Sequence, residues 1–451
     1  MADVGVAMSG GGHRASLFGL GVLMYLADAG VNRDVTSIAS VSGGSITNGY
    51  VGQTVDFRAV SGPEFEQAVA PYAKQLAQRG TLFATRGTTV YLVVAAITVL
   101  AAIVGPWFVP APGFVQGLVF VAALLAWMSL VFGRRGSVCA RAFATTVFSP
   151  TGKPTLLRDV HTNVDHVICA TELQSAEQIY FSGSFVYGYR FGKGVPADLP
   201  LHVAVQASSC LPGAFPPRWL PTAPHGFQYS TPDCPPPEDR PASKRNMVLV
   251  DGGVYDNMAD QWGQGFAGRK RCWPTIAQDA HEPEVLIVAN ASAGLEWKPF
   301  NRARIPAFGE IAALLKDKDV LYDQTTAVRR QGLVGRFDRA ALTGKGLRGA
   351  LVHIPESPFV VPKAFEADAT WPDRATRAGD VLKALGNTEA EWAETAKADS
   401  TVGTVLSKLG TDVSARLIHH AYVLTMANLH VILGTPLLPM PDRQRFVALV
   451  S

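Results

Sequence analysis

Charged residues are scarce in this chain of 451 residues. Asp, Glu, Lys and Arg together make up 17% of it, hydrophobic residues make up 48%, and the net charge is +3. So little charge is unusual for a fully soluble protein, and the length suffices for one large domain or two smaller ones. Arg269-Lys270-Arg271 is a short basic run typical of a solvated surface, so we expect no nucleic-acid partner.

Cysteine is scarcer still, and no two cysteines form a CxxC pair. The five are scattered along the chain: Cys139, Cys169, Cys210, Cys234 and Cys272. An odd number without motif spacing argues against a disulfide framework and against a zinc site. We therefore expect reduced cysteines and no metal. The N-terminus does not have the pattern of a signal peptide, because Asp3 and a glycine-rich loop interrupt its short apolar run.

No charged residue and no histidine occurs from Gly87 through Gly133. Two apolar runs within this stretch, Val90 to Trp107 and Phe114 to Phe132, are each long enough to span a bilayer as a helix. A turn rich in proline and glycine separates them. Soluble helices of this length normally have a polar face, so the pattern favours a transmembrane helical hairpin over a pair of buried core helices.

Arginines flank the hairpin on both sides and are absent from its turn: Arg79, Arg86, Arg134, Arg135 and Arg141. By the positive-inside rule, both flanks lie in the cytoplasm. We thus expect a multi-pass membrane protein with two spans and the rest of the chain on the cytoplasmic side. Trp107 and Trp127 are candidate interfacial anchors. A third apolar stretch, Leu417 to Leu438, contains His419, His420, Asn428 and His430, which favours a packed or membrane-surface helix over a span.

Strand and helix patterns alternate on both sides of the hairpin, which predicts an α/β domain with a largely parallel sheet. Before it, Val4 to Met8 and Thr36 to Val41 read as strands and Ala15 to Ala29 as a helix. After it we expect a helix over Leu201 to Ser209 and four strands: Val164 to Ala170, Gln178 to Phe181, Met247 to Val250 and Val285 to Ala289. Thr222 to Arg245 is predicted to be an exposed loop, with the role of a lid left open. Residues from about 300 onward read as mixed helices and loops.

The segment Ser40-Val41-Ser42-Gly43-Gly44-Ser45 follows a predicted strand and precedes a predicted helix. A strand–turn–helix elbow of this kind exposes a serine nucleophile, and it requires small neighbours for steric reasons. We therefore predict Ser42 as a nucleophile. Ser45 is a rival, but its place inside the following helix favours a structural role.

Three consecutive glycines, Gly10, Gly11 and Gly12, lie between the first strand and the first helix. Such a loop turns backbone N–H groups toward a concave site, and the helix that follows adds its positive end. This arrangement suits a tetrahedral oxyanion. The spacing matches neither a dinucleotide fingerprint nor a Walker A loop. Arg14 is a candidate contact for a substrate phosphate or a structural partner of a carboxylate, and His13 is predicted to be structural.

Asp251 ends the apolar strand Met247 to Val250 and is followed by two glycines. A carboxylate in this place can lie at the edge of the sheet where such folds hold their sites, and it could act as the general base for Ser42. Asp-Gly is also a common turn, so a catalytic role for Asp251 is supported only when the other two motifs are considered with it.

These motifs, in this order, resemble those of the patatin-like phospholipases. Ser9 to Ala15 is similar to the glycine-rich oxyanion loop of that family, Ser42 falls at the nucleophile of its GxSxG motif, and Asp251 falls at the aspartate of its DG[GA] motif. Ser40 stands where the family motif has glycine. Two further stretches are similar to the family. Its strand pair resembles Ala170-Thr171-Glu172-Leu173 with Tyr180-Phe181-Ser182, and its substrate-side helix and loop resemble Ala207 to Pro212 with Phe215-Pro216-Pro217. The resemblance covers about residues 1 to 75 and 140 to 295.

The resemblance implies a three-layer α/β/α sandwich in which residues 1–80 and 137–451 form one catalytic domain around the inserted hairpin of 87–133. It implies a Ser42–Asp251 dyad that hydrolyses phospholipid or lysophospholipid esters through an acyl-enzyme, with no metal or cofactor. Two alternatives stay open: an acyltransferase or esterase on the same dyad, and a membrane scaffold with a decayed site. A weaker alternative is a Ser-His-Asp triad that uses His281 or His353.

Overall fold

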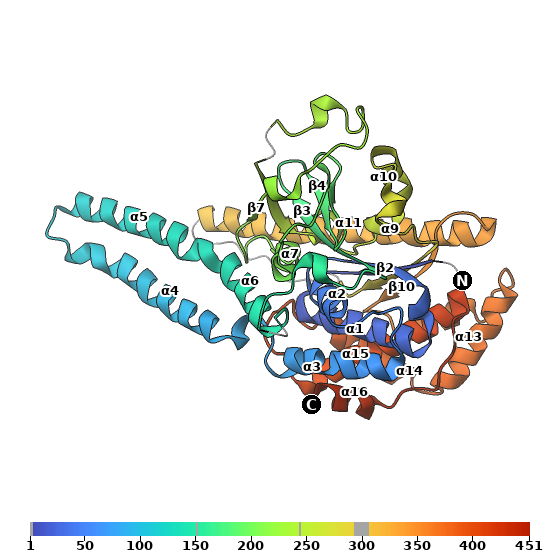
Figure 1. Ribbon diagram of the computed structural model, residues 1–451. Helices are drawn as coiled ribbons and strands as arrows, with labels where there is room; N and C mark the ends of the chain where they lie inside the picture. Colours follow the sequence, from blue (N-terminus) through green and yellow to red (C-terminus); the bar gives the residue numbers. More distant parts are fainter. Residues whose placement is uncertain (1–2, 150–151, 243–244, 293–305) are drawn as a thin grey trace.

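A central sheet of ten strands runs through the computed structural model of the chain, which describes residues 3–149, 152–242, 245–292 and 306–451 (Figure 1). Its main path has the order β10-β9-β1-β2-β3-β4-β5-β6, and β8 and β7 are attached to β3. The strands are β1 (Val4–Met8), β2 (Val35–Ser40), β3 (Asp165–Glu172), β4 (Glu177–Phe181), β5 (Val186–Gly188), β6 (Gly192–Gly194), β7 (Arg218–Pro221), β8 (Asn246–Asp251), β9 (Val285–Asn290) and β10 (Arg348–His353).

The sheet is mixed, with a parallel half and an antiparallel half. β10, β9, β1, β2 and β3 are parallel neighbours, whereas β4, β5, β6, β7 and β8 pair antiparallel. The strands predicted from the apolar runs are all present to within two residues at each end. β10 corrects the expectation of helices and loops alone after residue 300, because its short apolar run becomes recognisable as a strand only beside β9.

Two separate hydrophobic cores lie against the two faces of the sheet, because side chains alternate along each strand. In β1, Val6 and Met8 belong to the first core and Ala7 to the second. The first core includes side chains of α1 (Gly12–Asp28), α2 (Gly43–Thr54), α3 (Gly62–Gln78), α6 (Arg135–Thr146), α7 (Leu201–Ser208), α13 (Pro372–Leu385), α15 (Thr411–Leu433) and α16 (Arg443–Val450).

The second core packs α9 (Gln261–Gln264), α10 (Phe266–Cys272) and α11 (Pro306–Thr343) on the opposite face. Figure 1 shows these helices above the sheet and α1, α3 and α15 below it. Further helices of the body are α8 (Gly253–Asp256), α12 (Val360–Phe365) and α14 (Glu389–Ser400). The mixed α/β fold with a central sheet flanked by helices is therefore confirmed.

The third apolar stretch forms most of α15, which is buried against α1. Its polar residues have partners inside the molecule: His420 Nδ1 lies 3.1 Å from Asp399 Oδ2, and Asn428 Nδ2 donates to the Leu351 carbonyl at 2.9 Å. The prediction of a packed helix is confirmed.

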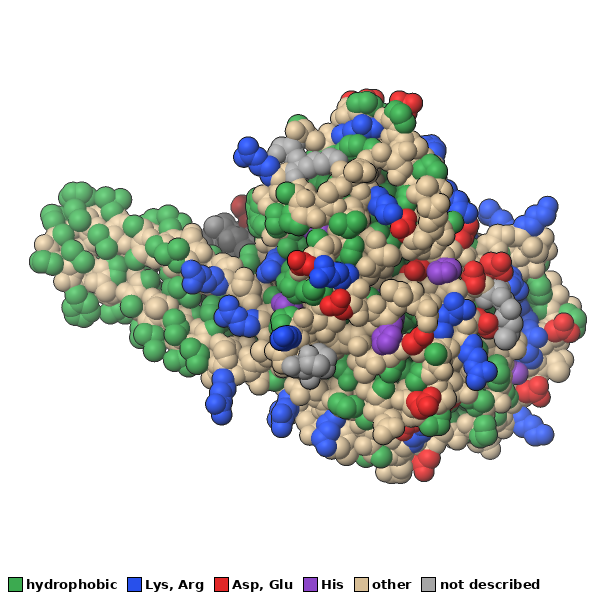
Figure 2. Space-filling view, in the orientation of Figure 1, with side chains coloured by type: hydrophobic (Ala, Val, Ile, Leu, Met, Phe, Trp, Pro, Cys, Tyr) green, Lys and Arg blue, Asp and Glu red, His purple; other side chains and the backbone are tan. Residues whose placement is uncertain are grey.

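The two longest apolar runs form a helical hairpin that projects from the body of the molecule (Figure 1). α4 (Arg86–Val104) and α5 (Gly113–Leu130) pack against each other, and both are long and apolar enough to cross a membrane. Only 6% of the most apolar part of the first helix and 0% of that of the second are buried. Figure 2 shows this projection covered by hydrophobic side chains, so the alternative of two buried core helices is wrong.

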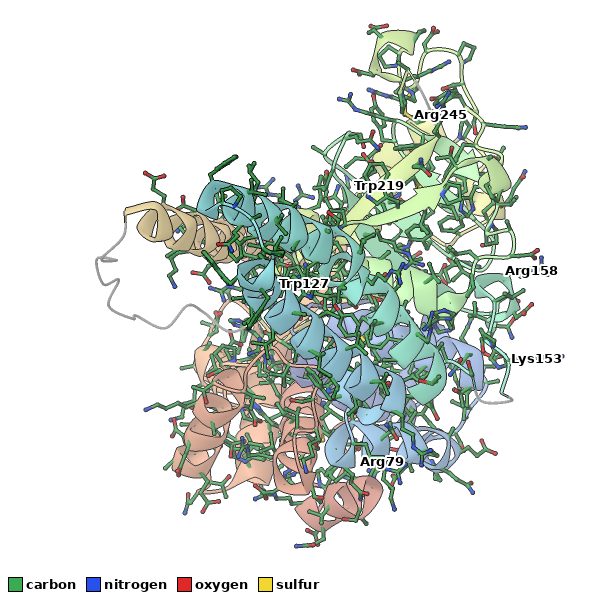
Figure 3. The ribbon with its side chains drawn as sticks, turned by 90° about the vertical axis from the view of Figure 1, so that its left-hand side faces the viewer. Arg79, Trp127, Lys153, Arg158, Trp219 and Arg245 are labelled. Atoms are coloured by element: carbon green, nitrogen blue, oxygen red, sulfur yellow. A yellow bond between two sulfur atoms is a disulfide. The ribbon has the colours of Figure 1, made fainter. Side chains whose placement is uncertain are left out.

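Trp127 joins the two helices of the hairpin (Figure 3). Its indole N–H donates to Thr98 Oγ1 on α4 at 3.0 Å, and its ring stacks on Phe132. The polar end of this side chain is hydrogen-bonded inside the hairpin, and its role as an interfacial anchor stays a prediction. Trp107 lies at the turn and is 59% exposed.

The expectation of five reduced cysteines is also corrected. Cys234 and Cys272 form a disulfide, which attaches the loop after β7 to the end of α10. Cys139, Cys169 and Cys210 are free and buried. The two bonded cysteines are 38 residues apart in the sequence, and their pairing follows from tertiary packing rather than from a local motif.

Candidate active site

The three motifs meet at one cavity of about 520 Å³. Gly10, Gly11, Gly12, Arg14, Ser42 and Asp251 all contribute to its wall. Apolar side chains from three other segments also line it: Leu82 and Phe83, Leu211 and Phe215, and Val405 and Leu406. The cavity is therefore large enough for an extended acyl chain beside a small polar centre.

The long strand β3 brings Ser42 and Asp251 to the same place. Along one edge of β3, Ile168 pairs with Ser40 of β2 and Ala170 pairs with Asp251 of β8. Because β2 runs parallel to β3 and β8 runs antiparallel, the two strands approach head-on and their carboxyl ends meet. The nucleophile turn after β2 and the aspartate of β8 thus share one gap in the sheet.

Ser208, at the end of α7, holds the two sides of this gap together. Its carbonyl accepts hydrogen bonds from the amides of Ser42 at 3.2 Å and Gly252 at 3.1 Å. Its hydroxyl donates to the Cys169 carbonyl at 2.6 Å and accepts a bond from the Ser42 amide at 3.0 Å. One residue therefore fixes the distance between the serine turn and the aspartate turn.

Ser42 has the backbone of a strained elbow. Its φ is 50° and its ψ is −119°, a conformation that a residue with a Cβ rarely adopts. Such a conformation costs about 1 to 3 kcal/mol and persists only where the surroundings enforce it. Ser42 remains 9% exposed and lines the cavity.

Gly43 is required because the glycine-rich loop touches it. A Cβ on Gly43 would lie 2.0 Å from the carbonyl oxygen of Gly12, and one on Gly44 would lie 2.6 Å from the carbonyl oxygen of Met8. Backbone atoms at these distances cannot move aside cheaply. The small residues of the elbow motif therefore allow the oxyanion loop to pack directly on the serine turn.

Gly11 and Gly12 have φ values of 139° and 58°, which favour glycine. Within the described residues, neither amide N–H donates to an acceptor in the protein. Gly10 differs, because its amide already donates to the Asn257 carbonyl at 3.0 Å. This bond corrects the expectation that all three glycines offer N–H groups to an oxyanion.

The residues after the glycines anchor the loop to a late segment of the chain. His13 Nδ1 lies 2.8 Å from the Ser407 carbonyl oxygen and Nε2 lies 3.0 Å from Thr81 Oγ1. Burial lowers the pKa of His13 to about 4, so it is neutral at pH 7. The structural role predicted for His13 agrees with these contacts.

Arg14 is buried in the cavity wall, and its Nη1 donates to the Val402 carbonyl at 2.5 Å. Its Nε has no hydrogen-bond partner among the described residues, and no ion pair to a described carboxylate is present. Burial lowers the pKa of Arg14 to about 10, so the guanidinium keeps its charge at neutral pH. The alternative of a structural pair with a carboxylate is therefore not what the described residues form.

Asp251 is 1% exposed, and two donors reach its Oδ1. The amide of Gly253 donates at 2.9 Å, and the hydroxyl of Tyr322 donates at 3.2 Å. Sequence reasoning did not find Tyr322, because it lies on α11, in the part of the chain without a motif. Ser208 lies in the stretch Ala207 to Pro212 that resembles the substrate-side helix and loop of the family, but the sequence did not indicate its bonds to the two turns. The segment 404–407 was not assigned to the site, because an irregular loop gives no local indication of such a role.

The rival residues lie in other environments. Ser45 Oγ contacts Ser40 Oγ at 3.1 Å and Ser208 Oγ at 2.9 Å, and Ser45 does not line the cavity. His281 bonds to Asp165, and His353 contacts Arg330. Neither histidine lines the cavity, and no described histidine does. This placement disfavours a Ser-His-Asp triad.

No protein-family model matches the chain, and no curated protein matches it in sequence. Among solved structures, human GIVD cytosolic phospholipase A2 is similar to it with a TM-score of 0.45 and 14% identity, over 99% of this chain and 60% of that one. The same human protein in complex with methyl gamma-linolenyl fluorophosphonate is similar with a TM-score of 0.39 and 12% identity, over 100% of this chain and 59% of that one. The chain thus spans about 60% of the length of these structures, and the chemistry of its site has to be inferred from its own residues.

Proposed function

We propose that the chain is a membrane-anchored serine lipid acyl hydrolase that cleaves acyl esters of phospholipids or lysophospholipids. One observation carries the proposal: Ser42, held at a positive φ, lines the same cavity as the buried Asp251 and the glycine-rich loop. A strained, solvent-reachable serine beside a carboxylate is the minimum that nucleophilic acyl transfer needs. Residues 1–80 and 137–451 would form one catalytic domain around the hairpin.

In the proposed reaction, the hydroxyl of Ser42 attacks the ester carbonyl while its proton moves to the carboxylate of Asp251. The tetrahedral intermediate collapses, the ester C–O bond breaks, and the leaving alcohol takes the proton back from Asp251. Water then attacks the acyl-enzyme with the same carboxylate as the base, and the free fatty acid leaves. No described residue other than these two has to carry a proton in this scheme.

The developing oxyanion would be bound by backbone N–H groups. The amides of Gly11 and Gly12 are available for it, and the amide of Gly43, directly after the nucleophile, is a third candidate that the sequence did not indicate. Donors fixed in advance stabilise the transition state without reorganisation, and losing one such donor typically costs about 3 kcal/mol.

The hairpin supports a lipid as the substrate because the cavity opens beside it. Leu82 and Phe83 line the cavity, and α4 begins only three residues after Phe83. Phe83 is 54% exposed. If α4 and α5 span a bilayer with both flanks in the cytoplasm, the mouth of the cavity lies at the membrane surface, where phospholipids enter without crossing water. Arg14, charged and without a described carboxylate partner, is a suitable contact for their phosphate.

The proposal is tested by measuring fatty acid release from phospholipid vesicles that contain the purified, reconstituted protein. We expect the wild type to release fatty acid, and Ser42→Ala and Asp251→Asn to lower the rate by at least about 1,000-fold, because each removes a partner of the proton transfer. Ser45→Ala is the matched control, since it removes a nearby buried hydroxyl that the mechanism does not use.

Release that survives in Ser42→Ala would overturn the assignment of the nucleophile, and loss only in Ser45→Ala would move it to that residue. No release by the wild type, from either diacyl or lysophospholipid vesicles, would contradict a lipid hydrolase.

A further inference from the structure

The carboxylate of Asp251 has a partner from a distant helix. Tyr322, on α11, donates its hydroxyl to Asp251 Oδ1 at 3.2 Å, and the Gly253 amide donates to the same oxygen at 2.9 Å. Tyr322 also lines the cavity. Two donors that converge on Oδ1 fix the plane of the carboxylate.

Gly253 leaves the space that the tyrosine hydroxyl occupies. A Cβ at residue 253 would lie 1.8 Å from Tyr322 Oη and 2.8 Å from its Cζ. The backbone φ of Gly253 is helical in α8, so conformation alone does not require glycine here. The absence of a side chain at this position is therefore explained by the close approach of Tyr322.

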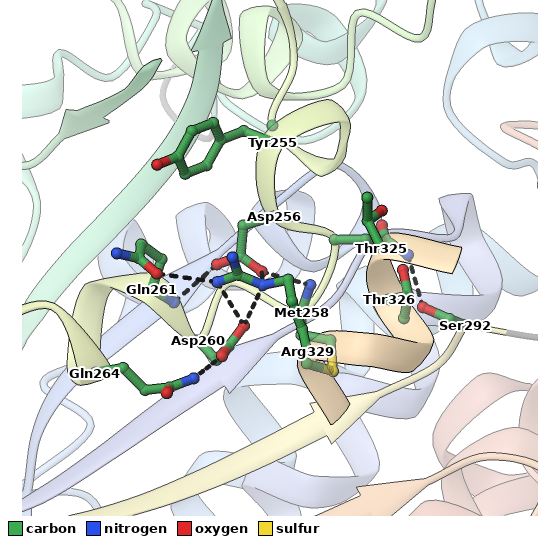
Figure 4. A network of polar contacts seen from close by, with 12 residues as sticks. Tyr255, Asp256, Met258, Asp260, Gln261, Gln264, Ser292, Thr325, Thr326 and Arg329 are labelled. Atoms are coloured by element: carbon green, nitrogen blue, oxygen red, sulfur yellow. Dashed lines mark hydrogen bonds and ion pairs between the residues drawn. The ribbon is translucent and has the colours of Figure 1, made fainter. Parts of the chain in front are cut away.

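An ion-pair network holds α11 in the position that delivers Tyr322. Arg329, about two turns after Tyr322 on the same helix, lies 3.3 Å from Asp256 Oδ1 and 3.3 Å from Asp260 Oδ1 (Figure 4). Both aspartate side chains are fully buried. Asp256 lies five residues after Asp251, so the network ties α11 to the segment that carries the proposed base.

We infer that Tyr322 is a positioning residue of the acyl-transfer site, which orients the Asp251 carboxylate and stabilises its ionised form. This inference rests on the proposed function and adds a positioning residue to the Ser42–Asp251 dyad. Burial and the nearby Asp251 carboxylate raise the pKa of Tyr322 well above its usual value, so its hydroxyl remains a donor throughout the working pH range. A donor to a carboxylate favours the ionised form over the acid.

Other charged or titratable groups surround Asp251 and stay unchanged when only the tyrosine hydroxyl is removed. The thiol of Cys210 is close, and burial raises its pKa to about 12. Asp256 and Asp260 form ion pairs with Arg329 on the helix that carries Tyr322. Arg14 and Asp323 line the same cavity as Asp251. A difference between the wild type and Tyr322→Phe therefore reports on the one hydrogen bond.

The test is the rate at which an alkyl fluorophosphonate labels the reconstituted, full-length protein, measured as a function of pH. In this reaction Ser42 Oγ forms a bond to phosphorus, the P–F bond breaks, fluoride leaves, and the serine proton goes to Asp251. The labelling rate thus requires the dyad and does not depend on the identity of the natural lipid. On the acidic side of the pH profile, called here the acid limb, the labelling rate rises with pH as the carboxylate of the base ionises.

For Tyr322→Phe we expect the acid limb to move to higher pH by about one unit, because a hydrogen bond to a charged group is lost. The maximal labelling rate is expected to fall about tenfold as the carboxylate loses its fixed plane. Gly253→Ala should move the limb in the same direction, since its methyl group displaces the hydroxyl. Combined with Tyr322→Phe it should add little, because both changes remove the same bond.

Tyr422→Phe is the matched control, because Tyr422 also donates to a carboxylate, Asp28 at 2.8 Å, far from the cavity wall. It should leave the acid limb in place. An unmoved limb in Tyr322→Phe, with Ser42 still labelled, overturns the role of the tyrosine and leaves the proposed function standing. A wild type that is not labelled at Ser42 overturns both.

Discussion

At the scale of single residues, the site depends on positions that have no Cβ atom. Gly43 has no Cβ because the Gly12 carbonyl occupies that place, and Gly253 has none because of the Tyr322 hydroxyl. Ser42 has a strained backbone with a positive φ, whereas positive φ values at residues 11 and 12 cause little strain because both residues are glycines. Close approach of neighbouring atoms thus explains Gly43 and Gly253, whereas backbone conformation explains Gly11 and Gly12.

His13 gives a prediction about pH. Its pKa falls from 6.5 to about 4 on burial, so the unfolded chain binds a proton between these values and the folded protein does not. Its contribution to stability is therefore full above pH 6.5 and is lost as the pH falls toward 4. We expect the free energy of unfolding to drop by about 2 kcal/mol between pH 7 and pH 5 through this residue alone.

Urea unfolding of the wild type and His13→Asn at both pH values checks this expectation, since the variant should have a smaller difference between them. His281→Asn is the control with the opposite sign, because the hydrogen bond that His281 donates to the Asp165 carboxylate raises the pKa of His281. An equal pH dependence in the wild type and His13→Asn would contradict the assignment.

At the scale of elements, two of them build the site without having a motif of their own. β3 is long enough to pair with β2 and β8 one after the other along the same edge. α11 carries Tyr322 to Asp251 and is fixed by Arg329. The glycine loop similarly rests on residues 402–407, where Val405 and Ser407 accept bonds from His13.

Arg329→Met should destabilise the protein by about 3 kcal/mol, because it leaves two buried carboxylates without their cation. Burial and the neighbouring Asp260 already raise the pKa of Asp256 well above its usual value. The matched control is Arg336→Met on the same helix, where the exposed guanidinium bonds only to Gln264 among the described residues. We expect less than about 0.5 kcal/mol there. Equal unfolding midpoints in urea for the two variants would show that the network does not hold α11.

At the scale of the whole molecule, a polar body is joined to an apolar projection. The hairpin leaves the body and returns beside its starting point, and the two flanking parts of the chain contribute strands to one sheet (Figure 1). Its exposed hydrophobic surface would be costly in water, which favours a membrane around it. Leu82 and Phe83 line the cavity and lie just before the hairpin, so under the proposed function the hairpin would hold the cavity close to its lipid substrate.

Replacing Leu118 and Leu125 on α5 by arginine tests this relation. Both side chains are more than 60% exposed, and each arginine would cost about 3 kcal/mol at the centre of a bilayer. We expect the double variant, synthesised in the presence of phospholipid vesicles, to lose flotation with them in a density gradient. Leu342→Arg is the control, because Leu342 is 65% exposed on α11 outside the hairpin. Flotation of the double variant like the wild type would argue against insertion of the hairpin.

The sequence by itself determined the features that depend on local chemistry. Apolar runs predicted the parallel strands β1, β2, β3 and β9 and the antiparallel strands β4 and β8, but not β10. The absence of charge from 87 to 133 predicted the hairpin. The motifs predicted which glycines, which serine and which aspartate would line the cavity, since each of these needs a turn that only small residues allow.

Tertiary structure alone decided which segments meet. Several contacts of the site and its surroundings join residues that are distant in the sequence. They are the head-on approach of β2 and β8, the hydrogen bond from the Gly10 amide to Asn257, the Cys234–Cys272 bond and the contact of Tyr322 with Asp251. Local propensity contains no information about such contacts, because their free energy arises from packing between elements and exists only once the fold has formed.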